Sequence, residues 1–250
     1  MWAVSSVARA VFVNPRRLAG VKPESRSVDR AGLAPGKRIF GGVGVKRGKL
    51  IVFEGIDGCG KSTQLRRVAE ALAARGVDVV VTREPTDGPW GRKIRAMAAS
   101  GEAVSPETEL DWFFEDRREH MRTLVIPALE AGRIVLSDRS YLSTVAYQGA
   151  RGLDAAGILA ASEAEFPRPD LVLLFELPAV EGLARVDARG TAREDVFENL
   201  PFQERVAEIF AGLDVEGLVR IDARRSEQAI TEEVIALVEA WLADAFGESV

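Results

Sequence analysis

The chain has 250 residues, of which 47% are hydrophobic and 28% charged, a composition that excludes intrinsic disorder and supplies enough apolar residues for one large or two small domains. Its single cysteine, Cys59, and single histidine, His120, exclude a disulfide scaffold, a cysteine-based zinc site and a metal cage of two histidines. The longest apolar run of the body, residues 171–175, is far shorter than the roughly 20 residues that cross a bilayer, so we expect no association with a membrane.

The formal net charge of −5 is unevenly distributed. Residues 1–49 contain eleven Lys or Arg but only Glu24 and Asp29 as acidic residues, which gives this segment a charge of +9 and the rest −14. Because residues 1–47 lack a sustained helical or strand period, we interpret them as a flexible, dispensable extension and place the domain at residues 48–248. An Arg-rich, acid-poor segment is also typical of a transit peptide, so organelle import is the alternative to the cytoplasmic location that we expect. The acidic body argues against nucleic-acid binding outside the extension.

From residue 50 onward, short apolar runs alternate with amphipathic stretches, which is the pattern of β-α-β units in a parallel sheet. The apolar runs predict five strands, at residues 50–54, 77–82, 134–137, 171–177 and 218–221. The amphipathic stretches predict helices at residues 61–75, 106–131, 154–165, 179–189, 201–211 and 227–246. We therefore expect an α/β fold, with a doubly wound five-stranded parallel sheet and flanking helices.

A glycine-rich loop follows the first predicted strand. Residues 55–62, Gly-Ile-Asp-Gly-Cys-Gly-Lys-Ser, match the pattern G-x4-G-K-[ST] and open the first predicted helix. Glycines let backbone N–H groups curl around phosphate oxygens, and the start of a helix carries partial positive charge. Lys61 would reach the β- and γ-phosphates, and the Ser62 hydroxyl would bind Mg²⁺. We assign nucleotide binding to Gly55, Ile56, Asp57, Gly58, Cys59, Gly60, Lys61, Ser62 and Thr63.

A phosphate-binding loop identifies a nucleotide site but not a reaction. Residues 53–64, Thr82-Arg-Glu-Pro85, Asp138-Arg139 and residues 143–148 together resemble the thymidylate kinase family, and the likeness extends over about residues 48–248. The resemblance implies the P-loop kinase fold, a homodimer, and Mg²⁺-dependent transfer of the γ-phosphoryl group of ATP to dTMP, which gives dTDP and supplies dTTP synthesis.

Two other functions stay open. The nearer alternative is a P-loop kinase that acts on another nucleoside monophosphate or on a nucleoside. The other is a nucleotide-binding regulatory switch. The sequence argues against this function because it contains no N/T-K-x-D guanine-recognition motif, and no lysine follows Lys93.

Asp138 directly follows the strand predicted at residues 134–137, a position from which a carboxylate can join Ser62 in the Mg²⁺ shell. The plainer interpretation of Asp138-Arg139 is a helix cap with a surface ion pair. The resemblance implies that Arg139 and Arg83 hold the acceptor phosphate. Asp57 is unusual inside a phosphate-binding loop because its charge repels phosphates. The family resemblance implies a clamp on the sugar 3′-hydroxyl, while an Asx-turn is the alternative.

Phe113 and Arg117 are four residues apart and so share one face of a helix, where an aromatic ring could stack on a base and a guanidinium could donate to the O4 acceptor of thymine. The resemblance places both residues in this way. It also implies that Ser143, Thr144 and Gln148 contact the acceptor nucleotide and that Tyr147 crowds the 2′ position, which favours deoxyribose.

Arg185, Arg189 and Arg193 recur every four residues, which indicates either a solvated stripe or a mobile lid that brings cations to the transferring phosphoryl group. Family members carry a basic residue in the loop or in the lid, and residues 56–59 contain none. Residues 195–198, Asp-Val-Phe-Glu, lack the arginine usual in the family, so which of Arg189 and Arg193 acts stays open. The predicted catalytic set is Lys61, Arg139, Asp57, Arg189 and Arg193.

Overall fold

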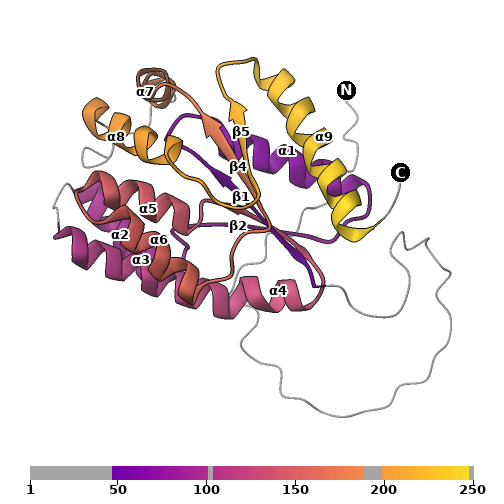
Figure 1. Ribbon diagram of the computed structural model, residues 1–250, viewed down its shortest axis with the longest axis horizontal. Helices are drawn as coiled ribbons and strands as arrows, with labels where there is room; N and C mark the ends of the chain where they lie inside the picture. The colour runs from indigo at the N-terminus through magenta and orange to yellow at the C-terminus, as the bar shows by residue number, and fades with distance from the viewer. Residues whose placement is uncertain (1–46, 101–103, 189–198, 248–250) are drawn as a thin grey trace, which may run out of the picture. The chain divides into compact units, whose positions relative to one another are not determined.

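The fold is built on a five-stranded parallel sheet, as the sequence predicted (Figure 1). The computed structural model describes residues 47–100, 104–188 and 199–247. The strands lie in the order β2-β3-β1-β4-β5. Their bounds are β1 Lys49–Glu54, β2 Val79–Arg83, β3 Ile134–Asp138, β4 Leu171–Glu176 and β5 Leu218–Asp222. Because the strands are parallel, their carboxyl ends meet at one edge, where Phe53 pairs with Asp138 and Asp138 with Arg83.

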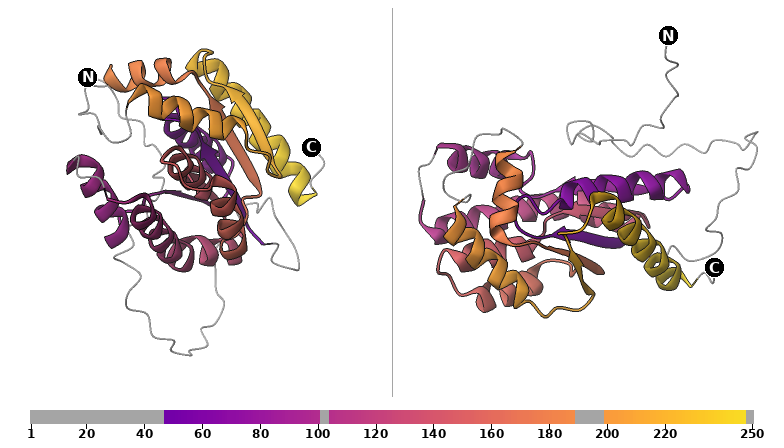
Figure 2. Two further views of the ribbon diagram at one scale, coloured as in Figure 1. Left: turned by 60° about the vertical axis from the view of Figure 1, so that its left-hand side comes forward. Right: turned by 90° about the horizontal axis from the view of Figure 1, so that it is seen from above.

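Helices cover both faces of the sheet. Helix α1 packs against β1, β2 and β3 with α9 beside it, while α4 contacts β3 and α8 contacts β4 from the other face (Figures 1 and 2). The helices are α1 Lys61–Ala74, α2 Pro89–Ser100, α3 Pro106–His120, η2 Met121–Val125, α4 Ile126–Glu130, α5 Tyr141–Ala150, α6 Ala155–Glu165, α7 Ala179–Asp187, α8 Leu200–Ala211 and α9 Glu227–Phe246. None of the helices in the described part of the chain has both the length and the apolar character of a membrane span.

Most predicted elements are confirmed with small shifts of their ends, and two helices were missed. Helix α5 is buried along nearly its whole length, so it lacks the polar face that sequence periodicity detects. Helix α2 contains Gly91, a poor helix former, but a Cβ at this position would lie 1.9 Å from the Thr86 carbonyl oxygen. The close approach of the loop to α2 therefore requires a residue that disfavours the helix.

The long helix predicted at residues 106–131 is interrupted. Ser105 caps α3 by accepting a hydrogen bond from the Thr108 N–H, as expected, but a π-helical segment, η2, separates α3 from α4. Pro127, near the start of α4, cannot donate a backbone hydrogen bond, which accounts for the altered pattern one turn before it.

The predicted helix at residues 179–189 ends at Asp187. Residues 1–46 lie outside the described residues, so the interpretation of the N-terminal segment as a dispensable extension stays a prediction.

The core is centred on β1 and β4. Every residue of β4 from Leu171 to Phe175 is buried, as are Leu50 to Glu54 of β1. Phe53 and Phe175, on these two strands, stack with ring centroids 6.0 Å apart and planes 13° apart. Burial of these apolar side chains is the main force that holds the edge of the sheet beneath the glycine-rich loop.

We expect Phe175→Ala to lower the free energy of unfolding by about 3–5 kcal/mol, because it removes a fully buried ring that stacks on the ring of Phe53. Urea unfolding followed by circular dichroism measures this loss. The control is Val180→Ala at a residue that is 60% exposed, which should change stability by less than about 0.5 kcal/mol. A loss below about 1 kcal/mol for Phe175→Ala would contradict the central place of this pair.

Candidate active site

The glycine-rich loop connects β1 to the first residue of α1, Lys61. Gly55, Gly58 and Gly60 have φ values of 140°, 80° and 93°, which side chains disfavour. A Cβ at Gly58 would also lie 2.1 Å from the Gly182 carbonyl oxygen, so the loop can approach α7 only because this residue is glycine. Cys59 packs in the core behind the loop, where burial raises the pKa of its thiol, so it fills a small-residue position and is not poised as a thiolate.

The start of α1 is available to an anion. Among the described residues no side chain caps this helix, and its first turn contains no acidic residue. The first N–H groups of a helix need acceptors, and phosphate oxygens supply them where side chains do not. The Lys61 ammonium lies over the loop, 3.4 Å from the Ile56 carbonyl oxygen and 3.7 Å from Asp57 Oδ1.

Asp57 joins the loop to Arg139 and Tyr147. Arg139 Nη2 donates to Asp57 Oδ1 at 2.5 Å, and the Tyr147 hydroxyl donates to Asp57 Oδ2 at 2.8 Å. Burial alone would raise the pKa of Asp57, but Arg139 and Lys61 together lower it to about 2. Burial raises the pKa of the Tyr147 hydroxyl, which therefore stays protonated as a donor. Gln203 of α8 also donates to Asp57, at 3.4 Å.

Ser62 and Asp138 lie together at the end of the loop. The Ser62 hydroxyl donates to Asp138 Oδ2, while Asp138 Oδ1 is buried without a hydrogen bond among the described residues. A hydroxyl and a carboxylate with a spare oxygen are ligands that suit Mg²⁺. The two residues predicted as metal ligands are thus neighbours.

Next to the loop is a cavity of about 290 Å³, and ten of the predicted residues line it. They are Asp57, Lys61, Ser62, Arg83, Phe113, Asp138, Arg139, Ser143, Thr144 and Tyr147. Six lining residues were not assigned to the site from the sequence, although the first two belong to the segment 82–85 that carries the family resemblance: Glu84, Pro85, Ile94, Arg95, Ala98 and Glu109. Glu84 follows the predicted Arg83, and Glu109 lies one turn before Phe113, so their positions beside predicted residues were the available signal.

Arg117 and Gln148 do not line this cavity. Both lie behind its wall, 1% and 0% exposed, and Arg117 reaches the wall through its contacts with Glu84 and Thr144. Arg117 Nη1 and both polar atoms of the Gln148 amide have no hydrogen bond within the described part of the chain. Buried polar atoms without partners are rare, and an ordered water or a ligand is one way in which they are satisfied.

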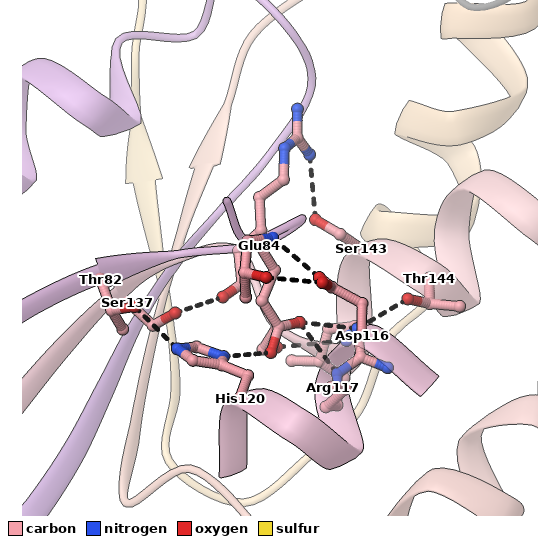
Figure 3. A network of polar contacts seen from close by, with 12 residues as sticks. Thr82, Glu84, Asp116, Arg117, His120, Ser137, Ser143 and Thr144 are labelled. Carbon is pink, nitrogen blue, oxygen red and sulfur yellow. Dashed lines mark hydrogen bonds and ion pairs between the residues drawn. The ribbon is translucent and has the colours of Figure 1, made fainter. Parts of the chain in front are cut away.

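A polar network holds Arg117 in place (Figure 3). Arg117 donates through Nε and Nη2 to Glu84 Oε2 at 2.9 and 2.7 Å, and Nη2 also donates to the Thr144 hydroxyl at 2.8 Å. The other oxygen of Glu84 hydrogen-bonds with His120 Nδ1 at 3.0 Å, and His120 Nε2 contacts the Thr82 hydroxyl at 2.7 Å. His120 therefore supports the site from the core.

The remaining predicted residues lie at its margin or beyond the described residues. Arg83 is largely exposed at the rim of the cavity and pairs with Asp87 at 2.8 Å. Arg185 of α7 donates to the Ala223 carbonyl oxygen at 3.1 Å. Arg189 and Arg193, the two arginines predicted to act from a lid, lie outside the described residues.

Comparison with known proteins gives one consistent result. A sequence model of the family described as thymidylate kinase matches residues 53–234. A protein named thymidylate kinase from Xanthomonas campestris pv. campestris is 47% identical over 197 residues, which cover 79% of this chain and 86% of the relative. Another of that name from Desulfotalea psychrophila is 43% identical over 196 residues, covering 78% of this chain and 96% of the relative.

The Glu84–Arg117 pair predicts a pH dependence of stability. Burial alone would raise the pKa of Glu84, but Arg117 and His120 lower it from 4.5 to about 2, so its stabilising effect is complete above pH 4.5 and is lost as the pH falls towards 2. We expect Glu84→Gln to lower the free energy of unfolding by about 3–5 kcal/mol at pH 7, because Arg117 loses its counter-ion, and to lower it by less at pH 3. Urea unfolding at the two pH values measures the difference.

The control is Glu70→Gln, which removes a negative charge from an exposed position on α1 and should match the wild-type protein within about 0.5 kcal/mol at both pH values. A cost of Glu84→Gln that does not shrink on acidification would show that the ion pair is not the source of the effect.

Proposed function

This chain belongs to the thymidylate kinase family, and we propose from that premise and from its site that it transfers the γ-phosphoryl group of ATP to dTMP, giving dTDP. The observation that carries the proposal is one shared cavity, in which the uncapped start of α1, with Lys61, faces Arg139, Phe113 and Thr144. A triphosphate held by the loop and a pyrimidine monophosphate held by the opposite wall would meet there.

The acceptor wall supports a pyrimidine deoxynucleotide. Phe113 offers a ring on which a base can stack. Behind the wall, Arg117 Nη1 and the Gln148 amide have no hydrogen bond among the described residues. Arg117 would donate to the O4 oxygen of thymine, which cytosine replaces with an amine donor. Asp57, held by the Tyr147 hydroxyl, would accept a hydrogen bond from the 3′-hydroxyl of the sugar.

Catalysis in this proposal consists of positioning and charge neutralisation. The acceptor is itself a phosphate oxyanion, so no side chain needs to remove a proton from it. Lys61 would bind the β- and γ-phosphates, and Arg139 and Arg83 would bind the phosphate of dTMP in line with them. Arg189 or Arg193 would add a further cation from the lid.

Mg²⁺ fits the oxygens of Ser62 and Asp138, since Asp138 Oδ1 is buried without a hydrogen bond among the described residues. When bound with ATP, the ion would neutralise charge on the phosphates. Beyond the site, we propose a homodimer, a cytoplasmic location and a catalytic domain formed by residues 48–248.

Lys61→Ala and Arg139→Ala should each lower kcat by about 100-fold or more while the fold survives, because each removes a cation that faces the transferring phosphoryl group. A coupled assay of ADP release measures kcat, and circular dichroism checks the fold. Lys93→Ala is the matched control, since Lys93 stacks on Trp112 with its ammonium 3.8 Å from the ring centroid and does not line the cavity. Turnover near the wild-type rate in either folded site variant would defeat these assignments.

Among the acceptors dTMP, dUMP, CMP and GMP, we expect the highest kcat/KM for dTMP. The kcat/KM for CMP and for GMP should be lower by a factor of about 100 or more, because buried donors left without acceptors penalise the wrong base. The same ADP-release assay, run at saturating ATP with each acceptor varied, measures this order. Preference for CMP or GMP would replace the proposal with a different nucleoside monophosphate kinase, and ATP turnover without any acceptor would favour a regulatory switch.

A further inference from the structure

Glu54, the last residue of β1, is fully buried and does not line the cavity, yet its carboxylate oxygens accept hydrogen bonds only from Ser140 and Ser143 among the described residues. These serines follow Arg139 in the chain. We propose that Glu54 is a positioning residue which, through the two serines, holds the backbone and the guanidinium of Arg139 in the orientation that receives the acceptor phosphate. This inference rests on the proposed function, because it assigns a role within the same reaction.

The backbone of Arg139 needs such support. Its φ is 75°, and it is the one non-glycine residue with positive φ in the described part of the chain. A side chain disfavours this left-handed conformation, which persists only where the surroundings impose it. The Arg139 N–H donates to the Phe53 carbonyl oxygen at 3.0 Å, and the next N–H, that of Ser140, donates to Glu54 Oε1 at 2.7 Å. Two consecutive residues of β1 thus fasten the strained turn.

Glu54 Oε1 also anchors the helix that begins at this turn. The Ser140 hydroxyl accepts the Leu142 N–H at 3.2 Å as the cap of α5, so its own proton is directed to Glu54 Oε1, 2.7 Å away. The Ser143 N–H points to the same oxygen at 3.3 Å. One carboxylate oxygen therefore collects three donors from the first turn of α5.

Glu54 Oε2 fixes the polarity of the contact between Ser143 and the Arg139 guanidinium. The Ser143 hydroxyl has one proton, which it donates to Glu54 Oε2 at 2.6 Å. Its oxygen is then free to accept from Arg139 Nη1, at 2.9 Å. On the other side of the guanidinium, Nη2 donates to Asp57. Glu54 therefore determines that Ser143 presents an acceptor, and not a proton, to Arg139.

Glutamine has nearly the shape of glutamate but cannot make the same set of hydrogen bonds. If its amide nitrogen faced Ser143, the Ser143 hydroxyl would lose the acceptor that now takes its proton. If the nitrogen faced Ser140 instead, it would oppose a backbone N–H, which cannot reverse its role. Either orientation leaves a buried donor without its acceptor, which is costly. The structure thus requires two oxygens at this position.

The test compares Glu54→Gln with the wild-type chain in the coupled ADP-release assay, varying dTMP and ATP in turn. We expect kcat/KM for dTMP to fall by about 10- to 100-fold, the cost of unsatisfied buried donors acting on Arg139, while KM for ATP changes by less than about threefold. In the Arg139→Ala background, Glu54→Gln should lower kcat/KM by less than about threefold, because the residue through which it acts is already gone.

The matched control is Glu176→Gln, the same substitution at the corresponding end of β4, where the side chain is exposed and pairs with Arg220. It should keep wild-type kinetics. Glu54→Asp retains both carboxyl oxygens but is one methylene shorter, and its kcat/KM for dTMP should also fall. This variant carries the test if thermal unfolding shows that the glutamine chain does not fold.

Three results would overturn the positioning role while the wild-type chain phosphorylates dTMP. They are unchanged kinetics in both folded Glu54 variants, an equal loss of ATP and dTMP binding, or a decrease of kcat/KM on Glu54→Gln that is the same with and without Arg139. Failure of the wild-type chain and of Glu176→Gln to phosphorylate dTMP is a different pattern. It would overturn the proposed function, and the positioning role for the acceptor phosphate with it.

Discussion

The site depends on holding one arginine, Arg139, in a strained conformation at the edge of a parallel sheet. Parallel strands end at the same edge, so the register that pairs Phe53 with Asp138, and Asp138 with Arg83, places the glycine-rich loop beside the residues that face it. Position alone does not direct a side chain. The left-handed turn at Arg139 reverses the chain into α5 and turns the guanidinium back over the loop, where Asp57 and Ser143 hold its two terminal nitrogens.

Much of the fold could be predicted because it follows from patterns that are local in the sequence. Apolar runs mark the strands, and caps such as Ser105 and Ser226 mark helix starts where their side chains accept backbone N–H groups. The sequence did not predict the helices in which tertiary contacts override the local pattern. Helix α5 is buried on nearly all sides and so shows no amphipathic period, and α2 tolerates Gly91 because the neighbouring loop leaves no room for a Cβ.

The candidate site divides in the same way. Lys61 and Ser62 belong to a contiguous motif whose spacing has a physical reason, and the family resemblance extended the prediction to residues such as Phe113. Residues that support the site indirectly, by hydrogen-bonding to another site residue, do not form a recognisable sequence motif. Glu54 and Glu84 are each next to a predicted residue, but a buried carboxylate is recognised by the donors around it, and those donors come from segments more than thirty residues away in the sequence.

These two buried carboxylates serve two arginines in physically different ways. Glu84 pairs directly with Arg117, accepting from Nε and Nη2, and the Thr144 hydroxyl also accepts from Nη2. The guanidinium is thereby fixed, while Nη1 has no hydrogen bond among the described residues. That suits the role we propose for Arg117, in which a single nitrogen is offered to a neutral base edge. Arg139, which we propose binds a phosphate, already pairs with Asp57, and Glu54 reaches its guanidinium only through the Ser143 hydroxyl. Inserting a neutral hydroxyl between the two charges transmits orientation while keeping a second carboxylate away from the phosphate.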